Sequence, residues 1–184
     1  YKEVETDTRT PEKYVIYQVD STITEGSIPD GEYVINSRDC VMSDDIFNGW
    51  TIGIDRSITD YEWASDSSGY TYNYFNTSTD NIFIFTHQGG NRYYIQNKKT
   101  GEYIVRSNWA MMYSSTPESF RVVVNDNGSI RIISDSASPD LNFYREWEYF
   151  EQKNVVDDNT VLWLYEPQYP SVADSGNEGG NEGG

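Results

Sequence analysis

The chain has 184 residues, with 13 Lys and Arg against 30 Asp and Glu, a formal net charge of −17 at pH 7. Such an anionic field repels phosphate backbones and anionic lipid surfaces, and the densest basic cluster is the pair Lys98 and Lys99. We therefore expect neither nucleic acid nor a membrane as a partner. Cys40 is the single cysteine, so no internal disulfide can form, and we expect its side chain to be a small buried group.

Residues 1–27 are expected to be a linker or the tail of a preceding module. They contain one strand-like run, Tyr14–Val19, which could pack on the main domain or belong to a neighbouring one. Residues Tyr1–Glu5 resemble Tyr165–Glu166, which follow the last predicted strand, as in a tandem array. The chain does not begin with Met and shows no signal peptide, so we expect a segment of a longer protein.

Residues 28–166 are expected to form one all-β domain. Helical periodicity is nearly absent there, and short apolar runs are bounded by Gly, Asn, Asp, Ser and Pro, which indicates strands. Aromatic residues, which favour strands, make up 15% of the chain. The twelve runs are Tyr33–Ile35, Val41–Met42, Trp50–Ile54, Ile82–Phe85, Tyr93–Gln96, Tyr103–Val105, Met111–Tyr113, Phe120–Val124, Ile130–Ile133, Leu141–Tyr144, Tyr149–Glu151 and Leu162–Tyr165.

These runs fall into three sets of four. Each set closes with a bulky apolar run, and those runs begin at residues 82, 120 and 162, about forty residues apart. One such unit cannot bury its apolar face alone, whereas three units together can close a barrel and remove most exposed strand edges. The pattern predicts a β-trefoil-like barrel of twelve short strands in three repeats, with an extra N-terminal strand.

Alternation along the runs selects the residues expected in the core. They are Tyr33, Ile35, Ile84, Ile95, Tyr103, Val122, Ile132, Leu141, Phe143, Leu162 and Leu164, together with Trp50 and Trp163, which lie inside predicted strands. The remaining C-terminal residues, 167–184, repeat Gly-Asn-Glu-Gly and are expected to form a disordered linker toward another module or an anchor.

The hairpin motif in Tyr93–Ile104 reads Tyr-Tyr-Ile-Gln-Asn, then a turn with Gly, then Tyr-Ile, and Gly31–Asn36 is a shorter copy. This string resembles the opening hairpin of ricin-type β-trefoil modules, over roughly Ile28 to Glu166. The Gln-x-Trp signature of that family is missing, because the equivalent positions read Glu118-Ser119-Phe120 and Val161-Leu162-Trp163. The resemblance implies a lectin-like barrel, and it extends to accessory modules in large secreted or surface proteins of gut-type bacteria.

One connection is much longer than a barrel needs. The segment Asp55–Asn81 is expected to be a long loop, and loops of this length in compact domains are usually functional or disordered. Flat rings stack on the C–H faces of sugars while carboxylates accept their hydroxyl protons, so a glycan site is one interpretation. The alternative is that the rings simply cap the barrel or anchor the loop. The residues expected at the site are Asp60, Tyr61, Trp63, Asp66, Tyr70 and Tyr72.

A second group of aromatic residues lies in the hairpins of the later repeats. Trp109 and Tyr113 belong to the second repeat and Trp147 to the third, at places where lectin-like modules stack a sugar. These three residues are therefore further candidates for ligand binding. They could instead form an apolar plug across the bottom of the barrel.

Metal and catalytic sites have little support in the sequence. Asp44–Asp45, Asn125–Asn127 and Asp157–Asn159 offer oxygen ligands for calcium, but none follows a known calcium-loop spacing, and turn chemistry explains them. His87 is the single histidine and is expected to be solvated beside a Gly turn. No nucleophile-elbow, zinc-protease or phosphate-loop motif occurs. We expect no cofactor and no enzymatic activity.

Two functions remain open. The first is a carbohydrate-binding module of a larger extracellular or cell-surface protein, which binds a neutral glycan because the surrounding carboxylates repel anions. The second is a structural or adhesive spacer that binds a protein partner and has no glycan pocket. A protease-inhibitor β-trefoil is a weaker interpretation, because such proteins normally stand alone without a linker tail.

Overall fold

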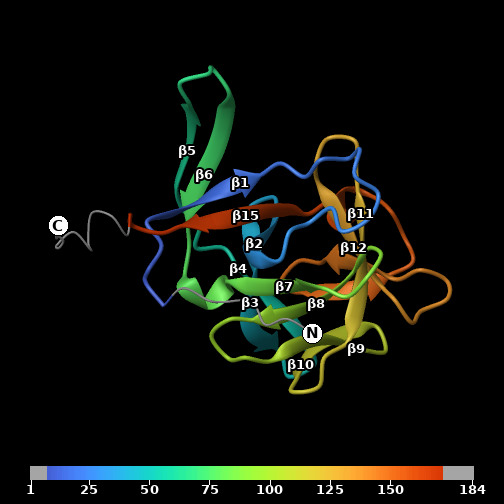
Figure 1. Cartoon of the computed structure of the whole chain (residues 1–184). Coiled ribbons are helices and arrows are strands. Elements are labelled where there is room, and N and C mark those ends of the chain that lie inside the picture. The colour runs from blue at the N-terminus through green and yellow to red at the C-terminus, as the bar shows by residue number, and fades with distance from the viewer. Residues whose placement is uncertain (1–7, 172–184) are drawn as a thin grey trace, which may run out of the picture.

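The computed structural model describes residues 8–171, which form fifteen strands and two short 3-10 helices (Figure 1). Within this range no helix is long and apolar enough to cross a membrane. The elements are β1 (Lys13–Tyr17), β2 (Gly31–Ser37), β3 (Cys40–Phe47), β4 (Thr51–Asp55), β5 (Thr59–Ser65), β6 (Thr71–Asn76), η1 (Thr79–Asn81), β7 (Phe83–His87), β8 (Arg92–Asn97), β9 (Tyr103–Ser107), β10 (Ala110–Ser114), β11 (Ser119–Val124), β12 (Ile130–Ser134), β13 (Asn142–Arg145), β14 (Phe150–Lys153), η2 (Asp158–Thr160) and β15 (Trp163–Gln168).

Six strands close a barrel. Antiparallel pairing runs from β2 to β7, β8, β11 and β12, and β15 pairs with β2 on the other side. The last gap, between β12 and β15, is closed where Ile130 and Leu162 exchange backbone hydrogen bonds of 2.8 and 2.9 Å. Closure leaves these six strands without a free edge.

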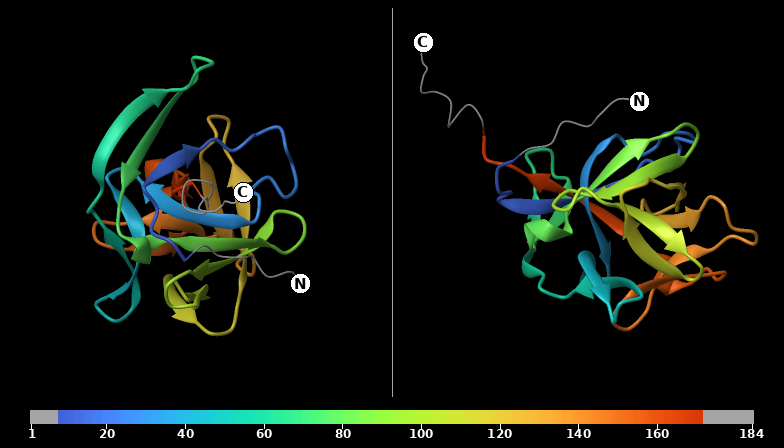
Figure 2. Two further views of the ribbon diagram at one scale, coloured as in Figure 1. Left: turned by 60° about the vertical axis from the view of Figure 1, so that its left-hand side comes forward. Right: turned by 90° about the horizontal axis from the view of Figure 1, so that it is seen from below.

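Three hairpins, β3–β4, β9–β10 and β13–β14, cover one end of the barrel (Figure 2). They meet at Thr51, whose hydroxyl donates to the carbonyl of Phe150 and accepts from the amide of Met111 at 3.1 Å. One residue thus links all three repeats. The twelve predicted runs coincide with β2–β4 and β7–β15, which confirms the predicted β-trefoil-like barrel.

The main core follows the predicted alternation with three exceptions, Tyr103, Trp50 and Trp163. Predicted core residues that lie in the main apolar cluster are Tyr33, Ile35, Ile95, Val122, Ile132, Phe143, Leu162 and Leu164. Ile84, Leu141 and Cys40 are also buried, as expected. Tyr103 is only partly buried, because Ile104 is the inward residue of β9. Trp50 is 38% exposed, because it sits in the turn before β4 and packs its ring on Tyr149 instead.

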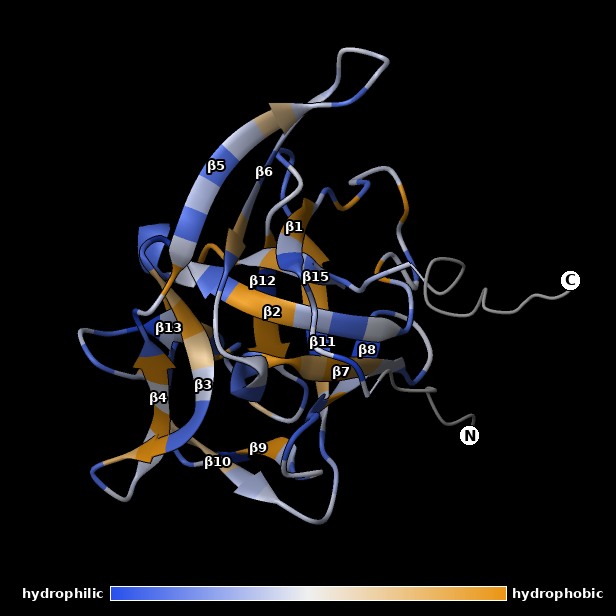
Figure 3. Ribbon diagram, turned by 90° about the vertical axis from the view of Figure 1, so that its left-hand side faces the viewer, coloured by the Kyte–Doolittle hydropathy of each residue, from blue (hydrophilic) through white to orange (hydrophobic). Residues whose placement is uncertain are grey.

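The long connection is not a loop, which corrects the sequence-based expectation. It folds as the hairpin β5–β6, which projects from the barrel (Figure 1). Strand β6 pairs with β1 through Tyr14 and Phe75, and β1 pairs along its whole length with β15. The N-terminal strand therefore joins the hairpin to the barrel. In Figure 3, β5 is mostly hydrophilic, whereas β3 and β4 carry strong apolar bands.

A second apolar cluster lies at the base of this hairpin. Its buried members are Tyr14, Val34, Val41, Phe75, Ile82 and Tyr165, with Ile16, Ile58 and Trp163 packed against it. Trp163, expected in the core, is therefore only partly buried. The cluster draws residues from β1, β2, β3, β6 and β15. It gives the hairpin a packed foundation, separate from the barrel core.

The ends of the predicted domain differ from the described structure. Val19 and Ile28 belong to the main core, so the segment before β2 contributes to the barrel. Strand β15 ends at Gln168, two residues beyond the expected boundary at 166. Residues 1–7 and 172–184, which include most of the predicted linker, lie outside the described residues.

Gly128 allows a test of the contact between Gln18 of the N-terminal segment and the turn between β11 and β12. It adopts a φ of +88°, and a Cβ there would lie 1.9 Å from Nε2 of Gln18, which donates to the carbonyl of Asn127 at 2.6 Å. Gly49 has a φ of +77° with nothing within 4 Å. In urea unfolding, Gly49→Ala should cost only the backbone strain, about 1 kcal/mol, and Gly128→Ala distinctly more. Equal losses would show that the Gln18 contact contributes nothing.

Candidate ligand-binding site

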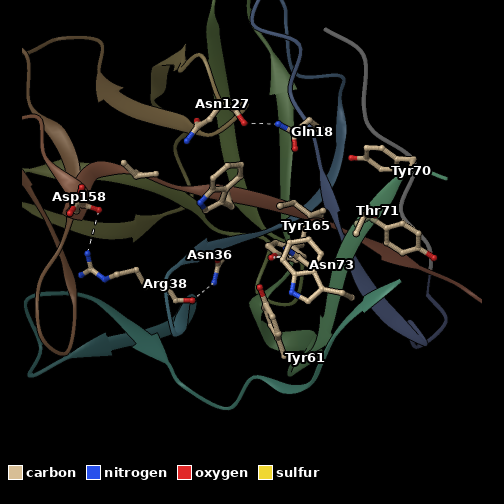
Figure 4. A pocket seen from close by; sticks show the side chains of 15 residues that line it. Gln18, Asn36, Arg38, Tyr61, Tyr70, Thr71, Asn73, Asn127, Asp158 and Tyr165 are labelled. Atoms are coloured by element: carbon tan, nitrogen blue, oxygen red, sulfur yellow. Dashed lines mark hydrogen bonds between the residues drawn. The ribbon is translucent and has the colours of Figure 1, made fainter. Parts of the chain in front are cut away.

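A pocket of about 640 Å³ lies between the β5–β6 hairpin and the barrel (Figure 4). We call it the hairpin pocket. Its volume is within the range typical of small-molecule sites. It is lined by Ile16, Gln18, Asn36, Arg38, Tyr61, Trp63, Tyr70, Thr71, Tyr72, Asn73, Asn127, Asp158, Val161, Trp163 and Tyr165.

Strand pairing decides which hairpin residues face this pocket. Trp63 lies opposite Asn73 in the register, and the Tyr61 ring stacks on Phe75 with centroids 6.5 Å apart. Asn73 and Phe75 are buried against the barrel, so Tyr61 and Trp63 share the inner face. Tyr72 lies on the opposite, outer face and stacks on Tyr70 at 6.4 Å, at the rim of the pocket.

The floor of the pocket is formed by β15. Tyr165 packs on Phe75 with ring centroids 4.2 Å apart, and its hydroxyl donates to Oδ1 of Asn73. Burial, and to a smaller extent the neighbouring Tyr61, raises the pKa of Tyr165 above the usual value of a tyrosine. Trp163 lies two residues earlier on the same strand and also lines the pocket. The inner face of the hairpin therefore opposes a fixed aromatic floor.

Polar groups from separate turns ring the aromatic part of the pocket. Arg38 and Asp158 lie across the pocket from Tyr61 (Figure 4). The guanidinium of Arg38 donates to Oδ1 of Asn159 at 2.6 Å and to the carbonyl of Asp158 at 3.4 Å. Gln18 and Asn127 add amide groups on a third side. The pocket thus offers hydrogen-bond donors and acceptors around flat rings.

The structure brings together four of the aromatic residues predicted from the sequence. Tyr61, Trp63 and Tyr70 are 53%, 63% and 50% exposed, and with Tyr72 they all line the hairpin pocket. These side chains do not plug the barrel, because the barrel is filled by other residues. Their role in binding a ligand stays a prediction.

The two predicted carboxylates do not line the pocket. Asp66 closes the hairpin turn, since its carboxylate accepts from the amide and hydroxyl of Ser68 at 2.9 and 2.6 Å and from the Tyr70 amide at 3.0 Å. The hydrogen bonds from Ser68 lower the pKa of Asp66. Asp60 sits at an irregularity in the β5–β6 register with a φ of +55°. The acidic side chain in the pocket lining is Asp158.

The remaining predicted aromatics lie elsewhere. The Tyr113 hydroxyl donates to the carbonyl of Ser43 at 2.5 Å, and burial raises its pKa, so this ring is part of the packed structure. Trp109 is 59% exposed beside Trp50 in a pocket of about 400 Å³. Trp147 is 77% exposed in another pocket, of about 520 Å³. Neither tryptophan is in the hairpin pocket.

Sequence analysis missed the polar residues of the pocket. Asn36 lies near the end of β2 and Arg38 in the turn after it, Asn127 lies between β11 and β12, and Asp158 opens η2. Asn127 and Asp158 were weighed as calcium ligands and interpreted as turn residues, Asn36 was part of a hairpin motif, and no role was predicted for Arg38. No local signal could identify them, because only closure of the barrel brings these turns together.

Candidate metal and catalytic groups have other roles in the structure. Within residues 8–171, no group of three or more His, Cys, Asp or Glu is placed to hold a metal ion. The carboxylate of Asp157 caps η2, and Asp44 is 3.6 Å from Nζ of Lys99. His87 is half-buried rather than solvated, because Nε2 lies 2.6 Å from the carbonyl of Gly90 and the ring packs on Tyr93. The expected absence of a cofactor stays a prediction.

Comparison with known proteins supports the fold. A solved structure described as "BEL beta-trefoil apo crystal form 3" superimposes with a TM-score of 0.53 and 19% sequence identity, over 79% of this chain and 99% of that chain. At this identity the likeness concerns the fold alone, and it identifies the barrel as a β-trefoil. No protein-family model and no curated protein matches the sequence.

Phe75 is expected to control whether the hairpin is ordered. Its ring is fully buried in the second apolar cluster, outside the barrel core. Phe75→Ala should cost about 3–5 kcal/mol of local stability and should remove hydrogen-exchange protection from β6 while β8 stays protected. Tyr74→Ala, on the outer face of the same strand, is the matched control and should preserve protection. Unchanged protection of β6 in Phe75→Ala would contradict this anchoring role.

Proposed function

We propose that this protein is a non-catalytic carbohydrate-binding module that holds a neutral glycan in the hairpin pocket. The observation that carries the proposal is that the exposed rings of Trp63 and Tyr61 line the same pocket of about 640 Å³ as Trp163 and Tyr165. Flat rings in one pocket suit the C–H faces of a pyranose. Amide, guanidinium and carboxylate groups at the rim suit its hydroxyls.

The pocket is also pre-organised. The hairpin is held by the buried Phe75 ring, and the floor is fixed by the hydrogen bond between Tyr165 and Asn73. Binding to a wall that is already ordered avoids the entropy loss of ordering a loop, which is about 1–2 kcal/mol per residue. A weakly interacting ligand such as a sugar benefits most from this saving.

Charge favours a neutral glycan over an acidic one. The chain carries a net charge of −17, and Asp158 lines the pocket. Arg38 is the cation among the described lining residues, and its guanidinium already donates to Asn159. A carboxylate or sulfate on the sugar would therefore meet repulsion that this arginine offsets only in part.

The cellular setting of the proposal comes from the sequence. The resemblance to ricin-type modules and the Gly-Asn-Glu-Gly tail support a place among other domains of an extracellular or cell-surface bacterial protein. In that setting the module would hold the polypeptide at a glycan surface. The solved β-trefoil of similar fold supports the fold that such a role needs, and we infer the ligand from the pocket.

A spacer or adhesive domain that binds a protein is the second candidate. The observation that favours it is a row of tyrosines on the outer face of the hairpin, where Tyr70 stacks on Tyr72 and Tyr72 on Tyr74 at 6.4 and 6.3 Å. Tyrosine rows are common at protein interfaces. The missing Gln-x-Trp signature also fits a module without the standard sugar pockets.

Trp63 is the residue whose loss separates the two candidates. On a glycan array followed by calorimetry, Trp63→Ala should weaken binding of a neutral glycan by about 10-fold or more, because a central stacking ring is removed. Its melting temperature should stay close to that of the wild type, since the ring is 63% exposed.

Trp109→Ala is the matched control, because that ring is 59% exposed in another pocket. It should leave the glycan affinity unchanged. If the folded wild-type protein binds no neutral glycan at all, the carbohydrate proposal fails and the protein-binding spacer is favoured.

A further inference from the structure

Arg38 lines two pockets. One is the hairpin pocket, and the other is the pocket of about 520 Å³ that contains Trp147, which we call the Trp147 pocket. The consecutive residues Asp158 and Asn159 are divided in the same way, the first lining the hairpin pocket and the second the Trp147 pocket. The two hollows therefore adjoin along Arg38 and the start of η2.

The shared boundary is held in place by hydrogen bonds. Arg38 occupies the turn after β2 with a φ of +53°, and its guanidinium donates to Oδ1 of Asn159 at 2.6 Å. The amide of Asn159 in turn donates to the Tyr144 hydroxyl at 2.7 Å. A guanidinium carries five N–H groups, so donors remain for a ligand that passes over this point.

Trp147 forms a second aromatic platform beyond this boundary. Its side chain is 77% exposed, and the guanidinium of Arg56 lies over the ring at 5.6 Å. Arg56 also donates to the carbonyl of Trp147 at 2.6 Å and pairs with Glu148 at 3.3 Å. The ring is thus braced while most of its surface stays open, as a stacking platform requires.

We propose that the hairpin pocket and the Trp147 pocket are consecutive subsites for one linear neutral oligosaccharide, which crosses Arg38 between them. This inference rests on the proposed glycan function and goes beyond it by specifying the ligand as a chain. Each pocket has the volume of a single small-ligand site, so a short sugar fills one and a longer chain reaches both. In the Trp147 pocket Asp39 pairs with Arg145 at 2.9 Å and Glu146 with Lys153 at 2.6 Å, so the described lining carries no unpaired carboxylate to attract a cationic chain.

A chain that occupies both subsites gains from the linkage between its units. Once the first unit is bound beside Trp63, the next is held at a high effective concentration near Trp147. Affinity should therefore rise with chain length until both platforms are covered. A module with one isolated pocket would show no such rise.

The test uses ladders of gluco-, xylo-, manno- and galacto-oligosaccharides from monosaccharide to hexasaccharide, with affinities measured by calorimetry. For the ladder that binds, the wild-type affinity should rise by about 10-fold or more from the shortest to the longest member. Trp147→Ala should abolish the rise and keep the short-chain affinity. Trp147→Phe, which keeps an aromatic ring, should retain part of the rise in affinity with chain length. Trp109→Ala, the matched control, should retain the whole rise.

The outcomes separate this inference from the proposed function. The two-subsite proposal is overturned if the affinity does not depend on chain length, or if the rise persists in Trp147→Ala. The proposed function still holds in either case if Trp63→Ala loses the binding of short chains. If no ladder binds the wild type, both fail together. A rise that Trp147→Ala removes and Trp109→Ala preserves supports the two consecutive subsites.

Discussion

The contact between Phe75 and Tyr165 is the interaction on which the candidate site depends. Strand β15 closes the barrel against β2 and β12, and the same strand presents Tyr165 to the hairpin. The Phe75 ring packs on it at 4.2 Å, while the Tyr165 hydroxyl bonds Asn73 two residues away. An apolar contact and a buried hydrogen bond thus fix the projecting hairpin to a strand that the barrel itself holds in place.

This anchoring converts an insertion into the wall of a pocket. A free loop of this length would lose much entropy on binding, whereas a paired hairpin presents Tyr61 and Trp63 on one face at no further cost of ordering. The closed barrel contributes the rest, because its turns bring Arg38, Asn127 and Asp158 to the opposite side. The proposed site therefore offers aromatic rings for the apolar faces of a sugar and polar groups for its hydroxyls.

Much of the scaffold could be predicted from the sequence, and the site only in part. The twelve β-trefoil strands were visible as short apolar runs between turn residues, and strands such as β8 and β11 alternate because they bury one face. The hairpin was hidden because it carries aromatics on both faces: Tyr72 and Tyr74 outside, Phe75 inside. Its exposed rings were identified because aromatic residues are unusually frequent in this segment. Asp60 and Asp66 were wrongly expected in the pocket, since backbone geometry rather than composition decides where a carboxylate points. The pocket amides come from distant turns and leave no local pattern.

The central claim is that ligand binds between the hairpin and β15, and the indole N–H signals of the five tryptophans test it most directly. In ¹H–¹⁵N spectra recorded during titration with a neutral oligosaccharide, we expect the signals of Trp63 and Trp163 to shift together, since both rings line the same pocket. The signals of Trp50 and Trp109, which line another pocket, should stay in place. Shifts at Trp50 and Trp109 with Trp63 and Trp163 unchanged would contradict the account.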